Sequence, residues 1–119
     1  MKYLCLVYID ENRLDALSEQ EFDGLTEAAL ANDDALRRRG HYLASNALQS
    51  VRAATSVRVR DGELAVTDGP FAETKEHLGG YILIEAADLS EAIGLAATIP
   101  MARLGTIEVR PIRELAPKD

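Results

Sequence analysis

The chain has 119 residues, of which 47% are hydrophobic, which is enough for one domain with a buried core. Its 13 basic and 20 acidic residues give a net charge of −7. This balance excludes the basic surface with which nucleic-acid-binding proteins neutralise phosphates.

Residues 2–9, KYLCLVYI, are almost continuously apolar and rich in aromatic and β-branched types, which predicts a buried central strand. The only cysteine, Cys5, lies inside this run and is expected to be a buried, inert thiol. The run is far shorter than the ~20 residues of a membrane span, and no cleavage site of small residues follows it. We therefore expect a soluble, cytoplasmic, single-domain protein over residues 1–119, with neither a membrane nor a nucleic acid as partner.

A capping box, Ser18-Glu19-Gln20-Glu21, predicts a helix over residues 18–39. Arginines followed by Gly40 are typical of its C-terminus. The apolar stripe of this helix consists of Phe22, Leu25, Ala29 and Leu36. Asn32 falls within the stripe, so its amide needs a protein partner or a ligand, unless the helix is rotated enough to solvate it. Residues 41–49 predict a second strand.

Two alternating runs, TSVRVR and ELAVT, are joined by Asp61-Gly62 and predict a β-hairpin. A two-residue turn pairs Val59 with Leu64 and Val57 with Val66, so that these apolar side chains share one face.

Residues 81–86, YILIEA, predict another core strand. Asp88 and Glu91 predict a second capping box and a short helix that ends before Pro100. The side chains expected to face the core from this helix are Leu89, Ile93, Ala96 and Ala97. Residues 105–112, GTIEVRPI, predict a closing strand, in which Pro111 favours the edge of a sheet.

Strand–helix–strand units at 2–49 and 81–112, with a hairpin between them, predict an α+β fold. We expect a ferredoxin-like sandwich with an inserted β-hairpin and with helices on one face of an antiparallel sheet. The other face needs a cover, and a second subunit would provide it, so we expect a homodimer.

A polar segment, Glu73-Thr74-Lys75-Glu76-His77, lies between the hairpin and strand 81–86. Asp68-Gly69-Pro70 predicts a tight turn before it, and Gly79-Gly80 after it permits a backbone or a ligand to approach closely. Phe71 is expected to fill the core. Solvated surface charge is the alternative interpretation of the polar segment.

We expect the segment to line a pocket for an oxygenated small molecule, because a lysine beside carboxylates presents donors and acceptors together. The candidate catalytic residues are Asp68, Glu73, Lys75 and His77, and the candidate ligand-binding residues are Tyr8, Asn32, Phe71 and Glu76. In a lyase or isomerase, Glu73 or Asp68 would transfer a proton and Lys75 would stabilise an oxyanion. Neither a cofactor nor a metal is expected.

The stretch VRVRDGELAVTDGPFAETKEHLGGYILIEAADLSEAI, followed by IEVRPI, resembles the DGPF branch of the YCII-related family. The DGPF tetrapeptide is residues 68–71, and the opening MKYLCLVYIDE is similar to the family's first strand. The resemblance implies a dimeric α+β barrel, in which two ferredoxin-like sheets face each other.

The resemblance implies less about function. Members of the DGPF branch are often encoded beside extracytoplasmic-function sigma factors, which favours the alternative of a non-catalytic regulatory or interaction module. The broader YCII family includes a dehydrochlorinase that acts on a chlorinated hydroquinone, and the resemblance implies a His–Asp pair as its catalytic residues. The predicted helix 18–39 contains no histidine, so that pair does not carry over.

Overall fold

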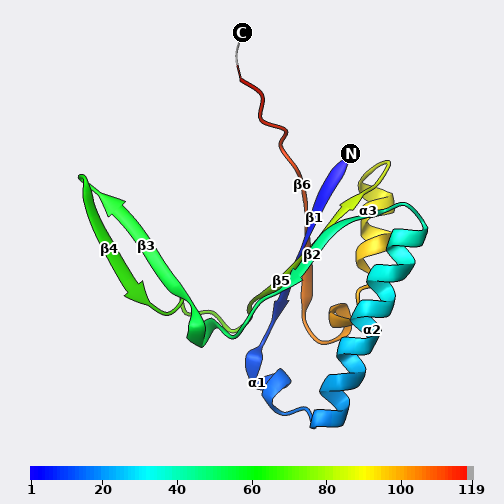
Figure 1. Ribbon diagram of the computed structural model, residues 1–119, viewed down its shortest axis with the longest axis horizontal. Coiled ribbons are helices and arrows are strands. Elements are labelled where there is room, and N and C mark those ends of the chain that lie inside the picture. Colours follow the sequence, from blue (N-terminus) through cyan, green and yellow to red (C-terminus); the bar gives the residue numbers. More distant parts are fainter. Residues whose placement is uncertain (118–119) are drawn as a thin grey trace.

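A four-stranded antiparallel sheet is the centre of the computed structural model, which describes residues 1–117 (Figure 1). The strands of this sheet are ordered β2-β5-β1-β6, and β3 and β4 form a separate two-stranded sheet. In chain order the elements are β1 (Lys2–Ile9), α1 (Glu11–Asp15), α2 (Glu19–Arg38), β2 (Tyr42–Ala47), β3 (Thr55–Arg60), β4 (Glu63–Asp68), β5 (His77–Glu85), α3 (Leu89–Ala96) and β6 (Thr106–Pro111). The predicted α+β fold is confirmed, and its strand order is compatible with a ferredoxin-like sandwich.

The central strand β1 has both edges paired, with β5 on one side and β6 on the other. Its alternate side chains Tyr3, Cys5, Val7 and Ile9 are buried. α2 and α3 lie on one side of the sheet (Figure 1), and the first three of these side chains form a core cluster with Leu36 of α2 and Ala92 of α3. Burial raises the pKa of the Cys5 thiol to about 11, as expected of an inert cysteine. β6 is an edge strand and ends at Pro111, as predicted.

α2 begins and ends where the sequence predicts. Ser18 and Glu21 form the complete capping box, in which the Ser18 Oγ accepts from the Glu21 N–H at 3.0 Å. At the other end, the N–H groups of Gly40 and His41 donate to the carbonyls of Arg37 and Leu36, which is a Schellman motif. Of its predicted stripe, Leu36 is 1% exposed but Phe22 is 48% exposed, so only the C-terminal half of α2 packs closely on the sheet.

The predicted inward face of α3 is partly wrong. Leu89 and Ile93 are 50% and 55% exposed, whereas Ala92, Leu95 and Ala96 are buried. Ala92, Leu95 and Ala96 belong to the core cluster, so α3 turns this alanine-rich face toward the sheet rather than the face that carries Leu89 and Ile93. Asp88 caps the helix as predicted, but the Glu91 carboxylate accepts from the N–H of Ala87 rather than completing a capping box with Asp88.

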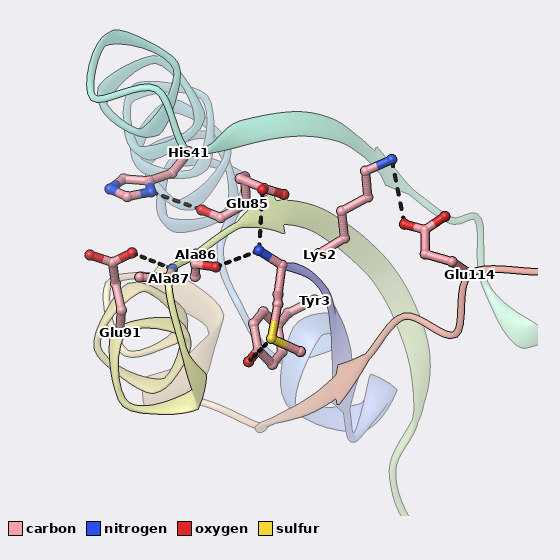
Figure 2. Close-up of polar contacts among 9 residues, drawn as sticks. Lys2, Tyr3, His41, Glu85, Ala86, Ala87, Glu91 and Glu114 are labelled. Carbon is pink, nitrogen blue, oxygen red and sulfur yellow. Dashed lines mark hydrogen bonds and ion pairs between the residues drawn. The ribbon is translucent and has the colours of Figure 1, made fainter.

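The amino terminus is hydrogen-bonded at the end of β5 that lies opposite to His77 (Figure 2). The Met1 ammonium donates to the Ala86 carbonyl at 2.9 Å and to Glu85 Oε1 at 3.2 Å. His41 Nδ1 lies 2.8 Å from the Glu85 carbonyl oxygen, so the start of β2 is joined to the same point. These contacts fix the register of the sheet at this end.

The hairpin has the predicted turn and register but does not join the main sheet. Asp61 and Gly62 both have positive φ, at 51° and 77°, as a two-residue type I′ turn requires. Val57 pairs with Val66 and Val59 with Leu64. The hairpin projects away from the sheet and helices (Figure 1), and all four of these side chains are more than half exposed.

Three further features depart from the sequence-based expectations. A short helix, α1, follows β1 directly. β5 begins at His77 rather than at residue 81, because residues 77–80 already pair with β1. Phe71 was expected in the core, and that expectation is wrong, because its side chain is 81% exposed.

Within residues 1–117, no helix is long and apolar enough to cross a membrane.

The close approach of β2 to β5 depends on Gly80. A Cβ added there would lie 2.8 Å from the Asn46 carbonyl oxygen, which belongs to a paired backbone and cannot move freely. We expect Gly80→Ala to lower the free energy of unfolding by about 1–3 kcal/mol in urea denaturation. As a control, Gly94→Ala in α3 meets nothing within 4 Å and should raise the stability by about 0.5–1 kcal/mol. Equal stability of Gly80→Ala and the wild type would contradict the contact.

Candidate functional site

A polar pocket of about 330 Å³ lies where β1 ends and β5 begins, and we call it the His77 pocket. The antiparallel pairing of Ile9 with His77 brings these two ends together. Its lining residues come from α1, from the loop before β3 and from the loop before β5: Asp10, Glu11, Asn12, Asp15, Val51, Arg52, Glu73, Thr74, Lys75 and His77.

Glu11 holds one wall of this pocket in place. Its carboxylate accepts from the Ser50 hydroxyl at 2.6 Å and from the Val51 N–H at 2.9 Å. The bond from Ser50, followed by that from Val51, lowers the pKa of Glu11 below its ordinary value, and the charges of Arg52 and His77 lower it further. Glu11 therefore joins α1 to the base of the hairpin, and each of its carboxylate oxygens accepts one hydrogen bond there.

Some of the other charged groups of the pocket have an ion-pair partner in the protein, and others have none. Arg52 lies 3.6 Å from Asp15 in an exposed ion pair. Within residues 1–117, Glu73 and Lys75 have no ion-pair partner, and both are exposed. His77 Nε2 is buried and has no hydrogen-bond partner in that same part of the chain. The pocket thus combines a carboxylate, an ammonium and an imidazole that the protein itself leaves unused.

The remaining candidate residues lie outside this pocket. Asp68 is the last residue of β4 and pairs with Thr55 at the base of the hairpin. Tyr8 is half-buried in β1 and pairs with Leu78 and Thr106. Glu76 accepts from the Thr106 hydroxyl at 2.9 Å. Phe71 lines a shallow depression over β3. The structure therefore brings together Glu73, Lys75 and His77, and separates them from the others.

Asn32 lines a different pocket, the Asn32 pocket, of about 150 Å³. It lies between α2 and strands β2 and β5, and most of its walls are apolar. The Asn32 pocket and the His77 pocket have no lining residue in common. A groove of about 540 Å³ along the first half of α2 adjoins both pockets. It shares Val7, Gly79 and Met101 with the former and Glu11, Asp15 and Arg52 with the latter.

Sequence reasoning missed Glu11, Asp15 and Arg52 as parts of the His77 pocket. An acidic pair, Asp10-Glu11, directly after a buried strand was a usable indication, because strand ends often deliver polar side chains to a site. The position of Arg52 depends on the loop between β2 and β3, which has no distinctive sequence pattern.

Comparison with known proteins places the chain in a family. The sequence model of the YCII-related domain matches residues 1–116. An uncharacterized protein of Rhizobium meliloti (strain 1021) is 38% identical over 120 residues, which span 94% of this chain and 92% of that protein. The family resemblance read from the sequence is therefore confirmed. The DGPF branch is compatible with these matches and stays a prediction.

The depressed pKa of Glu11 gives the fold an acid-sensitive contact. The contribution of Glu11 is fully present above its ordinary pKa of 4.5 and is lost as the pH falls through its lower folded-state value. We expect Glu11→Gln to lower the free energy of unfolding at pH 7 by about 1–2 kcal/mol, since a hydrogen-bonded charge is lost. Below pH 4.5 this difference from the wild type should shrink.

Urea denaturation between pH 7 and pH 3 measures this effect. Glu27→Gln removes an exposed carboxylate from α2 and serves as the control, with an expected change within about 0.5 kcal/mol. A Glu11→Gln difference that stays constant down to pH 3 would show that the carboxylate charge does not hold the loop.

Proposed function

The chain belongs to the YCII-related domain family, and we propose that it binds a small oxygenated metabolite in the His77 pocket. The observation that supports this most is the convergence of Glu73, Lys75 and His77 on one pocket without protein partners among residues 1–117. Neighbouring groups with a structural task, such as Glu11, are already hydrogen-bonded. An oxygenated ligand offers both acceptors for Lys75 and donors for Glu73.

We further propose that the bound metabolite undergoes proton transfer of the lyase or isomerase type. Glu73 or His77 takes a proton from a carbon beside a carbonyl, and the Lys75 ammonium stabilises the resulting enolate oxygen. In an isomerase the proton returns at another carbon, and in a lyase a leaving group departs with its electron pair. Neither the isomerase nor the lyase reaction consumes an oxidant or requires a cofactor.

A thermal-shift screen against small metabolites, mainly carboxylic acids and ketones, tests binding. A ligand at about 100 times its dissociation constant adds about 2.7 kcal/mol of stability, which moves the melting midpoint by several degrees. We expect hits that shift the wild type but shift Lys75→Met much less. Arg58→Met removes one positive charge from the hairpin, outside the pocket, and should respond like the wild type.

The outcomes separate three possibilities. A hit lost only in Lys75→Met supports binding in the His77 pocket. A hit retained in that variant places the ligand elsewhere and contradicts the proposal. The proposal is also contradicted if no metabolite shifts the melting midpoint of the wild type. If Lys75→Met melts far below the wild type without ligand, Lys75 braces the fold instead.

The second candidate function is a non-catalytic interaction module, and the exposed face of the hairpin favours it. Val57, Val59, Leu64 and Val66 are 62%, 58%, 67% and 57% exposed, and they lie together on one face. Contiguous exposed apolar surface of this kind often marks a protein interface. An extracytoplasmic-function sigma factor is the proposed partner, and the acidic net charge of −7 suits a basic surface on it.

A homodimer is part of both candidate functions. Leu4, Leu6 and Tyr8 alternate with buried residues of β1, so they lie on the sheet face opposite the helices. We propose that a second chain covers this face and forms the dimeric α+β barrel.

Sedimentation equilibrium tests which surface associates. We expect the wild type to have twice the 13.0 kDa chain mass. Leu6→Lys on the open sheet face should yield monomers, whereas Leu64→Lys on the hairpin should leave the dimer intact. The opposite pattern would place the hairpin in the dimer interface, and a monomeric wild type would refute the dimer.

A further inference from the structure

The Asn32 pocket lies on the helix-covered face of the sheet and is mainly apolar. Its apolar walls are Val7, Leu25, Ala29, Ala47, Ile82, Ile99, Pro100 and Met101. Its volume of about 150 Å³ matches that of apolar protein cavities that hold one benzene ring. A ligand that fills this pocket is therefore about the size of a six-membered ring.

One polar group in the pocket lacks a partner. Asn32 Nδ2 is buried and has no hydrogen-bond partner within residues 1–117. Buried amide donors are nearly always hydrogen-bonded, because leaving them unpaired costs free energy. The other polar side chains of the wall are hydrogen-bonded to one another. Ser45 Oγ donates to Asp33 at 3.0 Å, and Asn46 Nδ2 donates to the Tyr81 hydroxyl at 2.9 Å.

The charge of the pocket restricts the acceptor that a ligand can offer to Asn32. None of the lining residues is lysine, arginine or histidine, and Asp33 is among them. A carboxylate ligand would meet the negative charge of Asp33 without a compensating cation. A neutral carbonyl oxygen can accept from the amide without this repulsion.

We propose that the Asn32 pocket binds a neutral, ring-sized carbonyl compound. Its ring lies against Leu25, Ile82 and Met101, and its carbonyl oxygen accepts from Asn32 Nδ2. Because this pocket and the His77 pocket share no lining residue, the inference stands independently of the proposed function.

Three probes of similar ring size test this ligand class. Cyclohexanone carries the neutral oxygen, methylenecyclohexane has the same shape without it, and cyclohexanecarboxylate adds a negative charge. Titrations followed by two-dimensional amide NMR, at millimolar probe, report binding through the side-chain NH₂ signals of Asn32 and the amides of Gly79 and Gly80. We expect cyclohexanone to bind about fivefold more tightly than methylenecyclohexane, as one net hydrogen bond of about 1 kcal/mol implies. We expect cyclohexanecarboxylate to bind most weakly.

Two variants assign the preference to the amide. Asn32→Leu should bind cyclohexanone and methylenecyclohexane equally. Gln20→Leu is the matched control, because it removes an exposed side-chain amide of α2 that lies outside the pocket, and it should keep the fivefold preference. If Asn32→Leu does not fold, Asn32→Ala removes the same donor without adding bulk, and the same loss of preference is expected.

Several results would overturn the proposal. A wild type that binds none of the probes, binds the ketone and the hydrocarbon equally, or favours the carboxylate would contradict it. Signal changes confined to residues outside the Asn32 pocket would also overturn it, as would a preference for cyclohexanone that persists in the Asn32 variants.

Discussion

The pairing of β1 on both edges is the constraint on which the rest of the structure depends. With β5 on one side and β6 on the other, every second side chain of β1 must point into the core, and Tyr3, Cys5, Val7 and Ile9 do so. This alternation decides which face of the sheet the helices cover. The same antiparallel pairing brings the end of β1 beside the start of β5, so Glu11 and His77 meet although they are far apart in sequence. The pairing of β1 thus decides both which face of the sheet is buried and where the candidate site lies.

The Asn32 pocket and the groove beside it exist because α2 packs closely on the sheet only in its C-terminal half. Leu36 is almost fully buried, whereas Phe22, nearer the start of the helix, is half exposed. The first half of α2 therefore leaves a groove above β5, and the Asn32 pocket opens beside it. Glu11 stabilises the outer wall of this region by holding the loop at Ser50 and Val51. A helix packed along its full length would leave no space for a ligand on this face.

Local sequence patterns predicted the parts of the fold that local physics decides. The capping box at Ser18, the Asp61-Gly62 turn and the register of the hairpin all follow from nearest-neighbour chemistry, and all are present. The inward face of α3 was predicted partly wrongly, because alanine packing against the sheet, rather than side-chain size, sets its rotation. Phe71 was misplaced because its environment depends on where the hairpin lies. The candidate site shows the same limit: Glu73, Lys75 and His77 are neighbours in sequence, but Glu11 and Arg52 reach them only through the tertiary fold.

Two buried polar groups depart from local consistency, and both line pockets. Buried polar groups are nearly always hydrogen-bonded, so exceptions need a reason. Asn32 and His77 each keep a buried nitrogen without a partner within residues 1–117, and each lines a pocket. The hairpin and Phe71 expose apolar surface immediately before residues 73–77. Folding alone explains neither feature, because an apolar residue at 32 and a polar hairpin face would fold at least as well. The proposed binding would account for both, since a ligand would supply an acceptor to Asn32 and a second protein surface would cover the hairpin.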